Sequence, residues 1–213
     1  MNEKKMNVHQ ALAELKLLDK RIQSAIVGVT WVFPNEHANT VVNGVKLIDV
    51  VAGIVSQHQK VTDLIAYQSA LKRAVVLSNA VTKVTIAGEE MTVAEAIEMK
   101  NHGMATLAAL RDQMLKDHRR AESTAEINNG SRLESRATEF VKSMTGQTVT
   151  REVTGELKQM RDDFIKNHTT ELVDPIGVMK IAGELNDRID AFTAEVDAVL
   201  STSNSLTEIT VRW

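Results

Sequence analysis

The sequence contains no cysteine among its 213 residues and only two prolines. Without thiols, the chain cannot form disulfides, thiolate metal sites or a cysteine nucleophile. Glycine is also scarce, at 10 residues, and glycine and proline are the residues that most strongly mark turns. So few turn residues in a chain of this length favour long, uninterrupted elements.

Aromatic residues make up only 3% of the chain, while methionine reaches 9 residues. A core of aliphatic side chains and methionine suits helix packing better than a β-sandwich. The net charge of −3 lacks the basic excess typical of nucleic-acid-binding domains, so we expect no nucleic-acid partner. No run approaches the roughly 18 apolar residues of a membrane span, and the first residues lack a signal-peptide core. We therefore expect a cytoplasmic protein with no membrane partner.

Long helices are the dominant prediction. Apolar residues recur at alternating spacings of three and four, which is the pattern of a helix with one packed seam. This pattern predicts helices over residues 5–27, 46–80 and 93–126, and a last helix from Asp174-Pro175 to about residue 203. Seams of this kind indicate a long helical hairpin or bundle, and they favour a homo-oligomer.

A small β component is predicted from period-two alternation. Strands are expected at about 29–33, 83–87 and 207–213, joined in one small sheet. Around Asn43-Gly44, a common turn dipeptide, the chain forms either a hairpin or an ordered loop. We predict a mainly α fold, a single domain over residues 1–213, and a candidate hinge near residues 145–154.

Motifs that would indicate catalysis are missing. The chain has neither a His-Glu-x-x-His nor a Glu-x-x-His metal motif, no glycine-rich phosphate loop and no nucleophile elbow. Serine, aspartate and histidine occur, but no pattern places them together. We predict no enzyme activity, no cofactor and no metal site, with a metal-free hydrolase as the open alternative.

Clustered basic residues are the candidates for ligand binding, because an arginine fork binds phosphate bidentately. The strand-to-helix joint adds a second feature, since the backbone amides at the helix start after Thr92 should attract anions. Base stacking would have to use Trp31, Phe33, Tyr67 or Trp213. The alternative is an ordinary charged helix surface. The predicted ligand-binding residues are Lys72, Arg73, Asn79, Lys83, Thr92, Arg119, Arg120, Arg132 and Arg136.

Three segments carry a resemblance to a known family. They are ALAELKLLDKRI (11–22), SNAVTKVTIAGEEMTVAEAIEMK (78–100) and DPIGVMKIAGELNDRIDAFTAEVDAVLSTSNSLTEITV (174–211). Together they resemble a family of uncharacterised helical proteins encoded by bacteriophages and prophages. The resemblance implies a place in the cytoplasm of an infected or lysogenic bacterium, and it implies no catalytic residues.

Two functions remain after these steps. The first is a non-enzymatic, cytoplasmic binding protein that counteracts host defence, by sequestering a small anionic, nucleotide-derived signal or by binding a host defence protein. The second is a structural or assembly protein of the phage virion. Long helical seams favour both, whereas clustered arginines favour the first.

Overall fold

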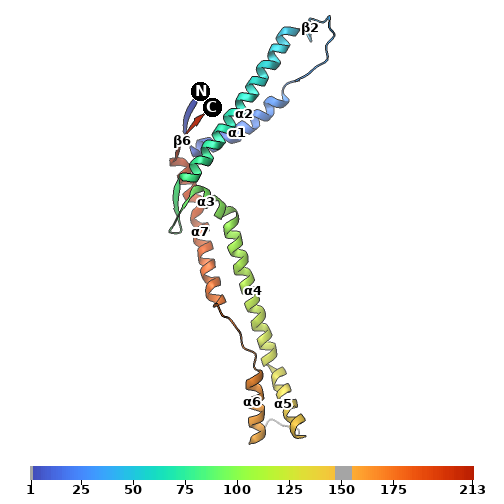
Figure 1. Cartoon of the computed structure of the whole chain (residues 1–213), viewed down its shortest axis with the longest axis vertical. Helices are drawn as coiled ribbons and strands as arrows, with labels where there is room; N and C mark the ends of the chain where they lie inside the picture. The colour runs from blue at the N-terminus through green and yellow to red at the C-terminus, as the bar shows by residue number, and fades with distance from the viewer. Residues whose placement is uncertain (1, 147–154) are drawn as a thin grey trace. The chain divides into compact units, whose positions relative to one another are not determined.

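A computed structural model describes residues 2–146 and 155–213 of the chain. The chain folds into two compact units: unit 1 holds the residues up to 102 together with 191–213, and unit 2 holds residues 103–190. Helices dominate both units (Figure 1), so the predicted mainly α fold with a small β component is confirmed. The prediction of a single domain stays a prediction.

Unit 1 is organised by two helices that pack side by side, α1 (Val8–Val27) and α2 (Leu47–Val81) (Figure 1). A capping box starts α1: Asn7 Oδ1 accepts from Gln10 N at 2.8 Å, and Gln10 Oε1 accepts from Asn7 N at 3.2 Å. The predicted helix start at residue 5 is therefore three residues early.

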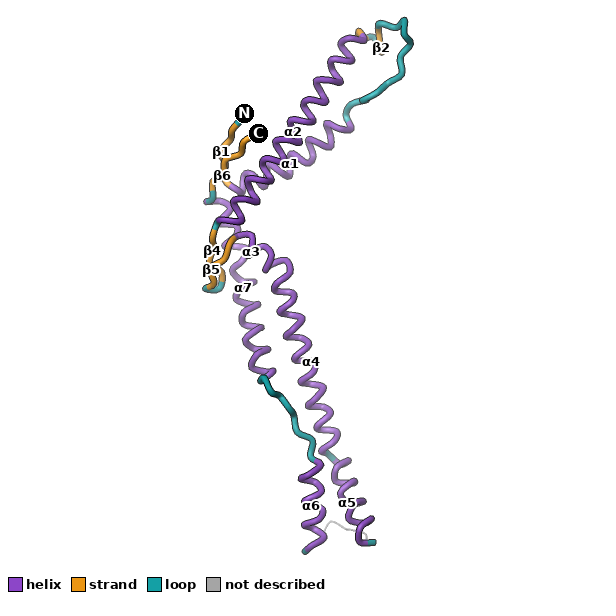
Figure 2. Tube along the Cα trace, viewed as in Figure 1, coloured by secondary structure: helices purple, strands orange, loops and turns teal. Residues whose placement is uncertain are grey.

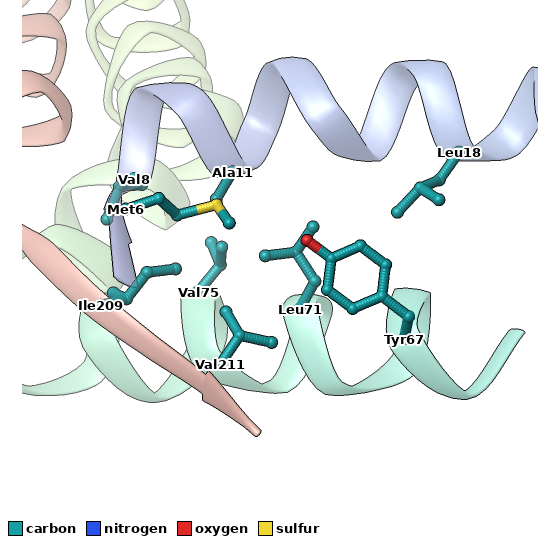
Figure 3. Close-up of a cluster of buried hydrophobic side chains, with 9 residues drawn as sticks. All are labelled: Met6, Val8, Ala11, Leu18, Tyr67, Leu71, Val75, Ile209 and Val211. Atoms are coloured by element: carbon teal, nitrogen blue, oxygen red, sulfur yellow. The ribbon is translucent and has the colours of Figure 1, made fainter. Parts of the chain in front are cut away.

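The residues before α1 form a strand instead. Strand β1 (Glu3–Asn7) pairs antiparallel with β6 (Glu208–Arg212), with Met6 opposite Ile209 and Lys4 opposite Val211. This pair ties the two ends of the described chain together, and Figure 3 shows its apolar side chains packed against α1 and α2. Leu71, Ala11 and Val211 are fully buried there. The core of unit 1 therefore depends on residues about 200 positions apart in sequence.

A tight hairpin follows α2, formed by β4 (Lys83–Ile86) and β5 (Glu89–Thr92). Ala87 and Gly88 have φ of 50° and 79°, as a two-residue hairpin turn of the primed type requires. Val84 and Ile86 are buried while Lys83 and Thr85 are exposed. This alternation confirms the predicted strand at 83–87.

The predicted single sheet is wrong, because the described strands form three separate pairs. Residues 29–33 lie in the described part of the chain but form no strand; Trp31 Nε1 instead donates to Ile26 O at 3.0 Å. The nearby hairpin joins β2 (Val41–Val42) and β3 (Val45–Lys46) around Asn43-Gly44. Closing the short loop between β4 and β5 costs less entropy than pairing β4 with a strand far away in the sequence. β4 therefore pairs with β5, and β6 pairs with β1.

The described elements between the β4–β5 hairpin and β6 are helices, and Figure 2 shows them along the chain. The helix predicted over 93–126 is helical throughout but interrupted: α3 (Val93–Glu98) leads into a π-helical turn, Met99–Gly103, before a longer α-helix begins at Met104. The last helix starts at Val178 rather than at Pro175, because Gly177 adopts a left-handed φ of 73°. Most of the predicted hinge, residues 147–154, lies outside the described residues. The remaining helices are α4 (Met104–Asn129), α5 (Ser131–Thr145), α6 (Glu156–His168) and α7 (Val178–Leu206), which contributes to both units.

No helix in the described ranges combines the length and the apolar character needed to cross a membrane.

Candidate functional site

The predicted ligand-binding residues are divided between the two units. Unit 1 contains Lys72, Arg73, Asn79, Lys83 and Thr92. Unit 2 contains the two arginine pairs, Arg119-Arg120 on α4 and Arg132 with Arg136 on α5. Each set is therefore judged within its own unit.

In unit 1 the strand-to-helix joint already has internal partners. Lys83 forms an ion pair with Glu90 across the hairpin, with 2.7 Å between Nζ and Oε1, and this hydrogen bond raises the pKa of Lys83. Thr92 caps α3: its Oγ1 accepts from Glu95 N at 3.2 Å, and Glu95 Oε2 accepts from Thr92 N at 2.7 Å. The hydrogen bonds that the Glu95 carboxylate accepts from Thr92 N and from Thr92 Oγ1 lower its pKa.

The next amide, Val93 N, donates to Thr82 O at 2.9 Å. The Glu95 carboxylate therefore takes the place that an anionic ligand would need at this helix start, and the joint offers fewer free donors than predicted. Lys72 and Arg73 lie exposed on α2, and Asn79 is half-buried near its end.

In unit 2 two of the predicted arginines lie on α5, beside an aromatic stack that α5 and α6 form together. The guanidinium carbon of Arg136 lies 5.9 Å from the ring centroid of Phe164. Phe164 stacks on Phe140 at 4.7 Å between centroids, and on His168 at 3.9 Å with 14° between the rings. We call Arg136, Phe140, Phe164 and His168 the arginine–aromatic row. Arg132 lies one helical turn before Arg136.

Helix periodicity explains how the row is assembled. On α5, Leu133, Ala137 and Val141 are buried at a spacing of four, and α5 packs against α6. Residues 132, 136 and 140 precede these positions by one, so they form a neighbouring stripe on the same helix. On α6, Phe164 and His168 are one turn apart. An ion pair between Arg161 and Glu134 joins the two helices.

The His168 end of the arginine–aromatic row lies next to a contact between α4 and the segment that follows α6. Asn129, the last residue of α4, donates from Nδ2 to Thr170 O at 2.8 Å and accepts from Thr170 N at 2.7 Å. His168 Nδ1 also lies 2.8 Å from Phe164 O, which orients its ring. The segment after α6 is thus held against the end of α4, two residues beyond His168.

The other predicted pair, Arg119-Arg120, is exposed on α4, and the contacts among the described residues do not include it in the row. The structure therefore brings Arg132 and Arg136 to one stripe and leaves Arg119 and Arg120 elsewhere on unit 2. Phe140, Phe164 and His168 were not predicted. Their i, i+4 spacing is visible in the sequence, but which helices would pair is not.

Chemically, the row combines two kinds of recognition. Aromatic rings accept a planar ring by stacking, and arginine binds phosphate or carboxylate oxygens through parallel N–H donors. His168 and both arginines are exposed, so a ligand can reach them. Glu134, the acidic side chain between the two arginines, is already held by Arg161. The row therefore suits an anionic ligand that carries a planar ring.

A second polar cluster lies in unit 1. Lys4 Nζ donates to Glu14 Oε2 at 2.7 Å, and the Tyr67 hydroxyl donates to Glu14 Oε1 at 2.9 Å. Burial alone raises the pKa of Glu14, but the bonds from Lys4 and Tyr67 outweigh it, so the pKa lies below its ordinary value. Burial, followed by the bond to Glu14, raises the pKa of Tyr67, and the bond to Glu14 raises that of Lys4.

The interactions that cause these pKa shifts stabilise a charged Lys4, a charged Glu14 carboxylate and a neutral Tyr67 phenol. Each group has its partner, which makes the cluster a link between β1, α1 and α2. Trp213 packs on Tyr67 with 4.3 Å between ring centroids. Both rings line an open hollow of about 710 Å³ along α2, and its lining also includes Lys60 and Asp63.

Within the described ranges, no group of three His, Cys, Asp or Glu residues could hold a metal ion. Comparison with known proteins finds no matching family model, no matching curated protein and no matching solved structure. Function has to be argued from the chain itself.

Proposed function

We propose that this is a non-enzymatic binding protein that captures an anionic ligand with a planar ring, such as a nucleotide-derived signal, at the arginine–aromatic row. The observation that supports it is the placement of Arg136 over Phe164, in a stack that continues to Phe140 and His168. Arg132 lies on the same stripe and supplies a second positive charge.

The expected affinity follows from the contacts. Stacking contributes about 1–3 kcal/mol per base, and hydrogen bonds to charged groups about 1.5–3 kcal/mol each. After the cost of association, an exposed site of this kind gives a Kd on the order of 10–100 μM. A measured Kd well below this range would favour sequestration of a scarce signal, whereas a Kd within it would favour binding of a more abundant ligand.

The biological setting of the proposal comes from sequence resemblance. In the cytoplasm of a bacterium carrying the phage, capture of such a ligand would counteract host defence; binding of a defence protein is the other form of the same role. The alternative function is a structural or assembly part of the virion. The apolar side chains that α2 leaves exposed, including Ile48 and Val76, favour that alternative. Gene position tests it: a place among capsid and tail genes would support a virion part.

The binding proposal is tested on the full chain by calorimetry and thermal shift with a cyclic mononucleotide, a cyclic dinucleotide and ADP-ribose. We expect at least one to bind the wild type and the Arg132→Ala/Arg136→Ala variant to lose at least tenfold in affinity. The matched control is Arg119→Ala/Arg120→Ala, which removes the same charge from α4 and should bind as the wild type does. Binding of none of the three, or equal losses in both variants, would contradict the proposal.

A further inference from the structure

The second helix exposes a long apolar stripe on the side away from its buried residues. Its members lie on one helix stripe, in which His58, Ser69 and Arg73 interrupt the apolar residues, and we call them the outer seam of α2. Three are well exposed: Ile48 by 74%, Val55 by 64% and Val76 by 65%. The outer seam consists of Ile48, Val51, Val55, Thr62, Ile65 and Val76.

The opposite side of α2 already packs against other elements of unit 1. Val61, Leu71 and Val75 are buried, and α1 and β6 pack against the helix. A helix with apolar residues on one stripe needs one neighbour, whereas a helix apolar on both sides is expected to be covered on both. The rest of the chain packs against the first side. On the outer seam Trp31 contacts His58, with 6.4 Å between the ring centroids, but Ile48, Val55 and Val76 remain largely exposed.

We propose that a second copy of this chain covers it, by packing its own outer seam antiparallel against the first. A seam with three–four spacing fits an identical seam, because the knobs and holes of the two helices match. A two-fold dimer needs such a self-complementary surface. This interface lies in unit 1 and does not depend on the ligand proposed for unit 2.

The available area suits a stable dimer. Full burial of one aliphatic side chain removes roughly 60–120 Å² from water. The five apolar members of the seam, with exposed Leu77 and the hairpin residues Val41 and Val45, offer roughly 500 Å² after their partial burial is counted. A standard interface buries about 800 Å² per partner, a little under 60% of it apolar. The face therefore holds about the apolar area that a dimer requires.

Charge decides the orientation. Lys72 and Arg73 lie exposed near one end of the seam. In a parallel pair each would face its own copy, and like charges repel; in an antiparallel pair they lie at opposite ends. Antiparallel packing also aligns the helix dipoles favourably.

The middle of the seam is compatible with close packing. Thr62 lies midway between Ile48 and Val76, and its hydroxyl donates to His58 O at 2.9 Å. It therefore brings no unsatisfied donor into the interface. At the hairpin end, a groove of about 670 Å³ lined by Val41, Ile48 and Val51 lies where the second copy's Val76 would pack.

Size-exclusion chromatography with light scattering tests the interface on the full chain. We expect a dimer for the wild type and a monomer, or at least a 100-fold weaker dimer, for Val55→Asp. Leu17→Asp is the matched control, because Leu17 on α1 is also about half exposed, at 54%, but lies outside the seam; it should remain dimeric. A monomeric wild type, or a Val55→Asp variant as dimeric as the control, would overturn the proposal.

Cysteine cross-linking tests the orientation, and the chain has no native cysteine to interfere. Under oxidation, Thr62→Cys should form a disulfide-linked dimer, since it lies at the two-fold axis. Val51→Cys should not, because the two copies of residue 51 would be about 33 Å apart along the antiparallel helices. Cross-linking of both variants would show a parallel pair and refute the antiparallel arrangement; cross-linking of neither would refute the register.

Discussion

Each of the two units is stabilised internally by a different kind of packing. In unit 1, β1 and β6 bring the ends of the described chain together and bury Met6, Ile209 and Val211 against two long helices. In unit 2, helices next to one another in sequence pack together, α4 on α5 and α5 on α6. Among its described residues, unit 2 buries Met104, Leu133, Ala137, Val141 and Ala182, and every other buried apolar side chain belongs to unit 1.

This difference predicts two kinds of stability. A core assembled from distant segments is lost as a whole, because each segment depends on all the others. Helices with few buried side chains open locally at a lower free energy. The candidate ligand site lies in unit 2, the part expected to open locally at a lower free energy, whereas the proposed dimer interface lies in unit 1.

The largest expected effect comes from Ile86→Asp. Ile86 is fully buried on β4, and an unpaired buried carboxylate should cost about 4 kcal/mol or more. We expect unit 1 to unfold as a whole, measured as lost hydrogen-exchange protection in α1, α2 and β6. Thr85→Asp, at the exposed neighbouring position, should cost less than about 1 kcal/mol. A stable Ile86→Asp variant would show that the unit 1 core does not include this strand.

A smaller and more local effect is expected from Leu133→Ala. Leu133 is 2% exposed on α5, and a buried leucine-to-alanine change costs about 2–5 kcal/mol. Hydrogen exchange should show α5 and α6 losing protection while β1 and β6 keep theirs. Leu71→Ala, the matched change in unit 1, should do the reverse. If Leu133→Ala destabilises β1 and β6 equally, the two units unfold together, as the predicted single domain requires.

The smallest effect is expected from Glu14→Gln in unit 1, at about 1 kcal/mol, because Lys4 is nearly half exposed. The pKa of Glu14 is lowered by folding, so its contribution is complete above the unfolded pKa and disappears as pH falls through the lowered folded value. The raised pKa values of Lys4 and Tyr67 imply the opposite at alkaline pH, where deprotonation removes their contribution.

Urea denaturation of the wild type and Glu14→Gln across pH measures this. The difference in unfolding free energy should be constant from about pH 5 to 9 and should shrink below about pH 4. A difference independent of pH down to about pH 2 would show that the Glu14 charge contributes nothing to the link between β1, α1 and α2.

Much of the fold was predictable from local signals. The seams predicted the long helices, the capping box at Thr92 and Glu95 predicted the start of α3, and alternation predicted β4 and β6. Strand β1 was missed because Glu3, Lys4 and Lys5 do not look like a buried strand, and the Asn7–Gln10 capping box that marks the true start of α1 was overlooked. Strand pairing was wrong because alternation shows which residues are extended, not which strand lies beside them.

The candidate site was predictable only in part. Arginine spacing on α5 pointed to Arg132 and Arg136, and the structure adds Phe164 and His168 from α6. The backbone amides at the helix start after Thr92 were expected to be free to bind an anion, because a helix start is visible in a sequence. That the Glu95 carboxylate accepts from Thr92 N depends on side-chain geometry, which the sequence does not show.

By itself, the sequence determined the helical character of this protein and its missing thiol chemistry, since these follow from composition and from spacing along one element. Tertiary structure alone decided that β1 closes on β6, that Arg136 lies over Phe164, and that one side of α2 remains largely exposed among the described residues. The physical reason is that pairing between distant segments depends on loop entropy and on packing between elements, and neither is written in the periodicity of a single helix or strand.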